Sequence, residues 1–411
     1  MKHVVPHAPR LKVRKTQPKP VPRRASQVTK DDLVEAIQNV KRLAASWRDR
    51  LPRHGKSQTD GTIRLASECA GYGSDIIAMH LLGLRSRTQL VLWSENCSTK
   101  QALHKTVMET CGMSSAFAKH TPDVCDRNTG SLPTPDLYIG GYPCPSWSKL
   151  GKGKGVRDSR GFLTLKGIEF IAEKRPRMIV LEQVSNIKCK KFLKSWNFLV
   201  DTLEALDYTV SHSTLNTKDF AIPQSRPRVY LLAVARESVV SPLVPPSPRS
   251  DCPANLSHFL DIRLLGSETL SMPEYEKQCG DSLWTVHRVL DVGSSERFQH
   301  AMDISPCLTR TRCQQAGYYL PTVRRRLLPK EMARLQGVPH KICKAMLKTE
   351  ASEGLSANAT AAAIGDAMSI NILMTAIQCT LECAGFLPRK KRYWEIVPPG
   401  KEAAQLSNVL F

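Results

Sequence analysis

Short apolar runs alternate with longer segments of helical periodicity from Thr62 onward. Each run spans six to eight residues, a length and composition typical of buried strands. We expect strands at 62–69, 90–95, 136–141, 178–184, 208–215 and 228–234, with helices between them that include 74–84 and 162–175. Strands and helices in alternation are typical of a doubly wound α/β fold, in which helices cover both faces of a mainly parallel sheet.

The pattern changes outside this part of the chain. Apolar residues recur at helical spacing between residues 29 and 60, which predicts a packing helix followed by a linker. The alternation stops at about 238–305, where prolines and weak periodicity indicate a small second region. We therefore expect the following organisation: a disordered tail at 1–28, the helix and linker at 29–60, a main domain at 61–237 that is completed by 306–390, the small region at 238–305, and a C-terminal tail at 391–411.

The charge of the chain suggests its partners. The 411 residues have a formal net charge of +22, which favours a polyanion such as nucleic acid as the partner. Residues 1–28 contain no acidic residue and carry two basic clusters. They fit a nuclear localisation signal or an arm that contacts DNA, and we expect a nuclear protein. An organelle transit peptide and a solvated tail that only aids solubility both stay open.

The thirteen cysteines predict neither a disulfide framework nor a zinc site. No Cys-x-x-Cys pair occurs, and the chain is long and lacks a secretory signal peptide, so we expect reduced thiols, no bound metal and an intracellular protein. No apolar run approaches the roughly 18 residues that span a bilayer, which argues against a membrane partner.

Two glycines and an acid form a candidate nucleotide site. Gly71 and Gly73 follow the first expected strand, where glycine lets the backbone approach a ligand closely. Glu95 ends the second strand, where a carboxylate can accept from both hydroxyls of a ribose. A Gly-x-Gly turn is common in proteins, but together with Glu95 it favours a cofactor that contains a nucleoside.

Three further strand ends place reactive groups at the same edge of the sheet. Cys144 lies between two prolines and is either an inert packing residue or a nucleophile presented by a stiff loop. Glu182 is either an acid that desolvation helps to hold a proton or a salt-bridged strand end. Arg226 and Arg228 share one face and fit either a ligand carbonyl or phosphate, or a solvated sheet edge.

Five motifs together resemble the cytosine-C5 methyltransferase family. They are "PCPSWS", "LEQVSN", "QSRPR", "RRLLPKEMARLQGVP" and "GDAMSINIL", in the family's order and spacing. The resemblance covers roughly residues 63–234 and 305–387. It implies a Rossmann-like methyltransferase sheet, with residues 238–305 in the place of the small target-recognition domain.

The resemblance implies roles for the candidate residues. Cys144 would add as a thiolate to cytosine C6, which makes C5 nucleophilic. Glu182 would hold and protonate the ring N3, and Arg228 would contact O2 and steady Glu182, with Arg226 nearby. Because a duplex buries the base, the cytosine would have to be flipped out.

The resemblance also implies S-adenosylmethionine as the methyl donor. The loop after the first strand would hold its methionine and adenosine parts, Glu95 its ribose, and Asp123 its adenine amine. The residues assigned to the cofactor are Cys69, Ala70, Gly71, Gly73, Glu95, Asp123, Leu163, Asp366 and Met368.

Five positions depart from the family pattern. Cys69 replaces a phenylalanine and removes an aromatic surface, Pro145 replaces glutamine, Gln183 replaces asparagine, and Asp366 and Ala367 replace the asparagine and serine of Gly-Asn-Ser. None removes the nucleophile, the acid or the arginines, so we expect activity, and slow turnover would fit these departures.

Three functions remain open. The net charge favours a DNA cytosine-5 methyltransferase that binds duplex DNA. RNA is a less favoured partner, because the Cys-Phe-Thr signature of the tRNA-modifying branch is absent from the sequence. A catalytically silent DNA-binding protein is the third reading. Because the recognition region is short, recruitment to particular loci would depend on unknown partner proteins.

Overall fold

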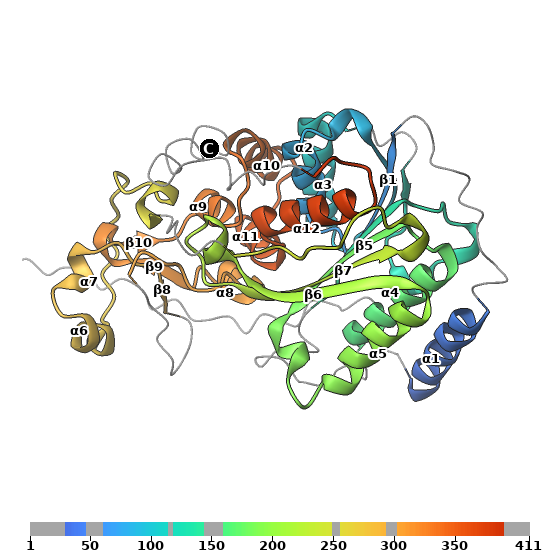
Figure 1. Cartoon of the computed structure of the whole chain (residues 1–411). Coiled ribbons are helices and arrows are strands. Elements are labelled where there is room, and N and C mark those ends of the chain that lie inside the picture. Colours follow the sequence, from blue (N-terminus) through green and yellow to red (C-terminus); the bar gives the residue numbers. More distant parts are fainter. Residues whose placement is uncertain are drawn as a thin grey trace, which may run out of the picture.

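A seven-stranded mixed sheet forms the centre of the molecule (Figure 1). The computed structural model describes residues 29–46, 61–113, 118–143, 159–248, 255–292 and 302–389. The strand order is β3-β2-β1-β4-β5-β7-β6. The strands are β1 Ile63–Glu68, β2 Thr88–Ser94, β3 Lys119–His120, β4 Leu137–Gly141, β5 Met178–Val184, β6 Tyr208–Asn216 and β7 Pro227–Ala235.

The pairing confirms the predicted α/β sheet. β3, β2, β1, β4 and β5 pair in parallel, and β7 runs antiparallel to both of its neighbours, β5 and β6. All six predicted strands are present, with ends within two residues of the expected ones. The sequence did not predict β3, which has only two residues and therefore carries no periodicity.

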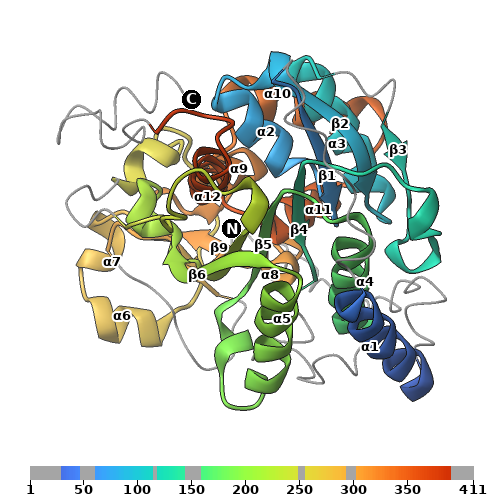
Figure 2. The same ribbon diagram turned by 45° about the vertical axis from the view of Figure 1, so that its right-hand side comes forward.

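Helices cover both faces of the sheet (Figures 1 and 2). One face carries α1 Lys30–Ala45, α4 Ser159–Lys174 and α5 Leu193–Ala205, and α1 packs on α4 and α5. The other carries α2 Ser74–Leu81, α3 Ser98–Cys111, α10 His340–Ser352, α11 Ala357–Asp366 and α12 Ile370–Cys383. The C-terminal helices thus complete the layer that α2 and α3 begin.

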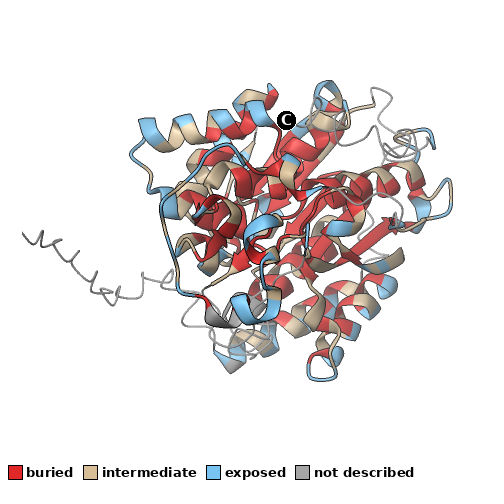
Figure 3. Cartoon of the chain, turned by 90° about the vertical axis from the view of Figure 1, so that its left-hand side faces the viewer, coloured by how far each residue is buried: buried red, intermediate tan, exposed pale blue. Residues whose placement is uncertain are grey.

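Alternating side chains of each strand divide the core between these faces. On β5, Val180 belongs to the apolar cluster under α2 and α12, whereas Ile179 belongs to the cluster under α4 and α5. The parallel strands are apolar on both faces because neither face meets solvent. Figure 3 shows the buried residues concentrated in the strands and on the inner sides of the helices.

A smaller unit extends from one end of the sheet, on the left in Figure 1. It contains α6 Pro273–Cys279, α7 Ser282–Thr285 and an antiparallel sheet of β8 Leu290–Asp291, β9 Tyr318–Leu320 and β10 Arg325–Arg326. β8 lies before the domain boundary predicted at residue 305, and its partner β9 lies after it. α8 Arg310–Gln314 and α9 Pro329–Leu335 connect this unit to the C-terminal helices.

Hydropathy and metal-ligand spacing give two further results for the part of the chain that the structure describes. No single helix there is long and apolar enough to cross a membrane, although α11 and α12, bent by 41° at the break between them, pass this test as a pair. The same residues contain no group of three or more His, Cys, Asp or Glu side chains arranged to hold a metal ion.

Candidate active site

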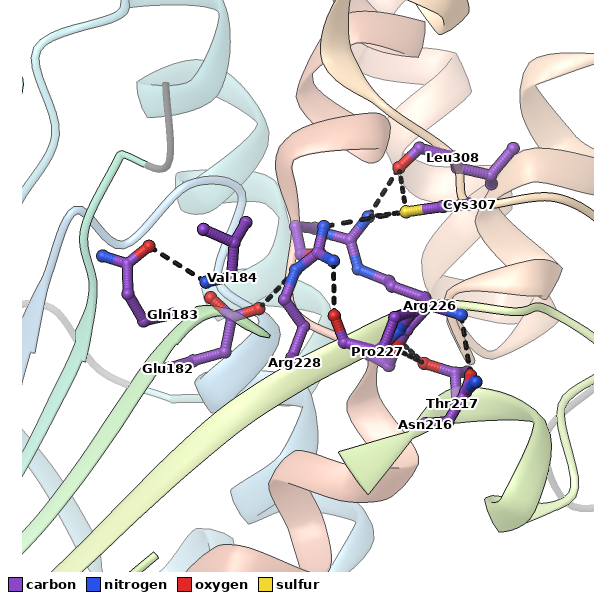
Figure 4. Close-up of polar contacts among 12 residues, drawn as sticks. Glu182, Gln183, Val184, Asn216, Thr217, Arg226, Pro227, Arg228, Cys307 and Leu308 are labelled. Carbon is purple, nitrogen blue, oxygen red and sulfur yellow. Dashed lines mark hydrogen bonds and ion pairs between the residues drawn. The ribbon is translucent and has the colours of Figure 1, made fainter. Parts of the chain in front are cut away.

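An acid and an arginine form an ion pair at the junction of β5 and β7 (Figure 4). Glu182 pairs in register with Tyr230, and Val184 with Arg228, so the Glu182 and Arg228 side chains project from the same face. Arg228 Nε lies 3.1 Å from Glu182 Oε1, and the Glu182 side chain is 5% exposed. An ion pair with so little contact with water is strongly oriented.

Arg226 is fixed by backbone carbonyl groups, of which Figure 4 shows that of Leu308. Its guanidinium donates to the carbonyl oxygens of Leu308 at 2.5 Å, Gly365 at 3.2 Å and Ala367 at 2.6 Å. The residue is 2% exposed. It therefore links the start of β7 to the loop after α11, and it lies beside Arg228 as the sequence predicted.

Cys307 is a further residue at this site that sequence reasoning missed. Its Sγ accepts from Arg226 Nη1 and from Arg228 Nη2, each at 3.7 Å (Figure 4). Burial alone would raise the pKa of this thiol, but the charges of Arg228 and Arg226 outweigh burial and lower the pKa from its ordinary value. No motif marks this cysteine, and only the fold brings it to the arginines.

The predicted nucleophile, Cys144, lies outside the described residues. The strand that leads to it is described: Gly141 ends β4 in register with Glu182 on β5. Tyr142, which is 2% exposed, and Pro143 then precede Cys144. The role of Cys144 therefore remains a prediction, and the chain enters its loop beside Glu182.

The loop after β1 and the end of β2 meet as predicted. Glu95 Oε2 accepts from the Gly71 backbone N at 3.1 Å, and Glu95 Oε1 accepts from the amides of Asn96 and Cys97 at 3.0 Å each. Gly73 has φ +95°, and a Cβ there would lie 3.2 Å from the His104 ring. Glycine is required at this position by both conformation and space.

Cys69 has a left-handed backbone conformation, with φ 52°. A non-glycine residue is uncommon in this region and is strained there. Burial, Glu95 and Glu68 raise the pKa of the Cys69 thiol well above its usual range, so the thiol stays protonated. The cysteine that stands here in place of the family's phenylalanine is therefore uncharged, as the phenylalanine would be. Ala70 follows it and is buried, with its amide donating to the Ser94 carbonyl at 2.9 Å.

The carboxylate at Asp366 has two cationic partners. Lys100 Nζ lies 2.9 Å and Arg310 Nη1 3.3 Å from Asp366 Oδ2. Burial would raise the pKa of Asp366, but Lys100 and Arg310 outweigh it and lower the pKa. The aspartate that replaces the family asparagine is therefore compensated by these cations. In the loop after α11, Met368 packs beside Gly141: a Cβ on that glycine would lie 3.3 Å from the methionine methyl group.

The remaining predicted positions have structural contacts of their own. Asp123 follows β3, and its Oδ1 accepts from the Cys125 amide at 2.8 Å. Leu163 lies on α4, is 9% exposed, and belongs to the same apolar cluster as Tyr142. The longer Gln183 uses its side-chain oxygen to accept from the Val184 amide at 3.0 Å. These contacts do not test the predicted roles of Asp123 and Leu163.

A buried charge network connects the two halves of the site. Glu68, at the end of β1, forms an ion pair with Arg127, and the two side chains are 0% and 3% exposed. Tyr138 donates to Glu68 Oε2 at 2.5 Å and Tyr142 does so at 3.1 Å. The network ties the loop of Cys69 to the end of β4. The one signal of this network in the sequence is an acid at the end of the first strand.

The chain matches the family described as C-5 cytosine-specific DNA methylase over residues 82–377. The site lies on a protein of this class, and the chain belongs to that family. Its relatives include the type II methyltransferase M1.ScrFI of Lactococcus lactis subsp. cremoris, 27% identical over 56% of this chain and 60% of the relative. The type II methyltransferase M.SsoII of Shigella sonnei is 26% identical over 62% of this chain and 68% of the relative. The type II methyltransferase M.HhaI of Haemophilus parahaemolyticus is 26% identical over 57% of this chain and 80% of the relative. The match thus spans about 60% of the length of M1.ScrFI.

Proposed function

We propose that this protein is a DNA cytosine-5 methyltransferase. The observation that carries the proposal is the buried Glu182–Arg228 ion pair, 3.1 Å long, beside the strand that leads to Cys144. Family membership and the net charge of +22 support DNA as the substrate.

Each reacting group of the proposed site has a distinct task. The Cys144 thiolate adds to C6 of a flipped cytosine, and Glu182, in its protonated form, gives a hydrogen bond and then a proton to N3. Arg228 donates to O2 of the base while its Nε keeps Glu182 oriented. Once C5 carries the methyl group that the cofactor would supply, loss of the C5 proton to a base and return of the N3 proton to Glu182 restore the aromatic ring and expel the Cys144 thiolate.

The residues at the β1–β2 edge fit S-adenosylmethionine. A Cβ on Gly71 would meet no atom within 4 Å, so there is open space beside its backbone and the buried carboxylate of Glu95. A ribose needs a carboxylate of this kind, and an electropositive sulfonium is compatible with it. When bound, the cofactor supplies an electrophilic methyl group. Glu95 and the Cys69–Gly73 loop would hold it, with Asp366 and Met368 contributed from the C-terminal half.

Transfer of tritium from labelled S-adenosylmethionine tests the proposal. Purified protein would be offered duplex DNA and tRNA side by side, with Cys144→Ser as the inactive control. We expect label in 5-methylcytosine of the DNA and none with the serine variant. Label only in tRNA would overturn the choice of substrate, and label in neither would favour a silent DNA-binding protein.

A further inference from the structure

The segment that carries Cys307 is fixed against the start of β7. The Ser305 amide donates to the Pro223 carbonyl at 2.7 Å, and the Ser305 carbonyl accepts from the Ser225 amide at 2.8 Å. The Leu308 amide donates to Gln224 Oε1 at 2.9 Å. These bonds hold the backbone on both sides of Cys307, so the position of its sulfur is set by the fold.

The two arginines that contact this sulfur differ in how they are held. Arg226 is 2% exposed and donates to three carbonyl oxygens that belong to other segments. Arg228 has a side chain that is 12% exposed, and its Nη1 donates to the carbonyl of the adjacent Pro227 at 2.8 Å. Cys307 Sγ lies 3.7 Å from a terminal nitrogen of each arginine. It therefore connects the guanidinium of Arg226 to that of Arg228.

We propose that Cys307 is a positioning residue of the base site: its sulfur bridges the guanidinium groups of Arg226 and Arg228 and keeps Arg228 directed at Glu182. This inference rests on the proposed function. Two adjacent guanidinium groups repel each other, and an anion between them offsets that repulsion in a site with little water. A bridging thiolate thus stabilises the arrangement in which Arg228 Nε faces the carboxylate.

The groups around Cys307 are consistent with a thiolate there. Arg228 and Arg226 outweigh burial and lower the pKa of Cys307. Burial raises the pKa of both Cys313, on α8, and Tyr318, on β9, so these neighbours stay neutral near pH 7. Asp366 pairs with Lys100 and Arg310. A neutral Cys307 thiol would instead donate to the Leu308 carbonyl at 3.5 Å, an oxygen that already accepts from Arg226 at 2.5 Å.

The pH dependence of alkylation tests for the thiolate without any need for activity. Full-length protein carrying Cys144→Ser would be treated with iodoacetamide between pH 5 and 10, and each cysteine mapped by peptide mass spectrometry. We expect Cys307 to react with a midpoint below the usual thiol value of about 8.5, and the midpoint to rise when Arg228→Gln is added. Cys313, which is 1% exposed, is the matched control and should react only slowly. A midpoint at or above the usual value, or one that Arg228→Gln leaves unchanged, would overturn the proposal.

Kinetics test the positioning role. In enzyme with Cys144 intact, we expect Cys307→Ala and Cys307→Ser each to lower kcat about tenfold, because a displaced guanidinium stabilises the developing charge poorly. The KM for S-adenosylmethionine should stay within about twofold, since the cofactor edge is unchanged. Cys313→Ala should retain kcat.

Full activity of Cys307→Ala would overturn the positioning role, and full activity of Cys307→Ser would overturn the need for an anion. If no methyl transfer occurs even in the unmodified protein, the proposed function fails, while the alkylation result still decides the state of the sulfur.

Discussion

The two edges of the site hold charge in different ways. At the β5–β7 edge, Glu182 forms an ion pair with the Arg228 guanidinium, 3.1 Å long. At the β1–β2 edge, Glu95 accepts from three backbone amides, two of them in its own turn. The first arrangement suits a group that must exchange a proton, because its partner is a side chain beside the reacting base. The second suits a group that only has to bind, because fixed amides hold the carboxylate in one orientation.

Substitution of the two acids gives the largest expected contrast between the edges. Glu182→Gln removes the proton donor and should lower kcat by about 10²–10⁴-fold, while S-adenosylmethionine affinity changes little. Glu95→Gln, the matched variant at the other edge, should mainly weaken cofactor binding. Single-turnover rates and equilibrium titration of the cofactor measure the two effects separately. If both variants weakened cofactor binding equally, the division of tasks between the edges would be wrong.

The network that connects the edges should dominate stability. Arg127→Met leaves the Glu68 carboxylate buried without its cation, and we expect a loss of about 3–5 kcal/mol in the free energy of unfolding. Urea denaturation followed by circular dichroism measures this loss.

The double variant Glu68→Leu with Arg127→Met is the control, because it removes both charges and should recover much of the lost stability. A double variant as unstable as Arg127→Met alone would show that packing, rather than the unpaired charge, decides stability there.

A smaller loss of stability is expected when Asp366, which pairs with Lys100 and Arg310, is replaced. Its folded-state pKa is lowered by Lys100 and Arg310, so its stabilising contribution is present above the unfolded value of 3.8 and is lost as the pH falls through the lower folded value. Because the side chain is 32% exposed, Asp366→Asn should cost at most about 1 kcal/mol at pH 7.

Thermal unfolding of Asp366→Asn and of the unmodified protein at a series of pH values measures the contribution of the Asp366 ion pairs to stability. The difference in Tm should shrink as the pH falls below 3.8. Glu353→Gln, at an exposed position, controls for the loss of one negative charge. A difference that is the same at every pH would exclude the ion pairs as its cause.

Sequence reasoning located the parts of the site that strands carry. Apolar runs gave the strands, and strand ends of a parallel sheet share one edge, which is why Glu182 and Glu95 lie where the sequence placed them. Arg228 followed from the two-residue period of β7. Each of these residues takes its position from the local pattern around it.

Residues that act through distant partners could not be found in this way. Lys100 and Asp366 are 266 positions apart, and Cys307 is 79 from Arg228. Neither contact follows from periodicity: the first depends on how α11 returns to pack beside α3, and the second on how the segment before α8 returns to pack against residues 223–225. Glu68 ends β1 and its partner Arg127 lies in a loop, so only the ion pair between them explains why each charge is buried.

Covalent trapping tests the central claim most directly. Duplex DNA that contains 5-fluorocytosine would be incubated with S-adenosylmethionine and the protein, because fluorine blocks the final elimination and preserves the bond to the nucleophile. We predict an adduct that survives denaturation and maps to Cys144, and that is absent from Cys144→Ser. The absence of an adduct from active protein, or an adduct that maps to Cys307, would contradict this account.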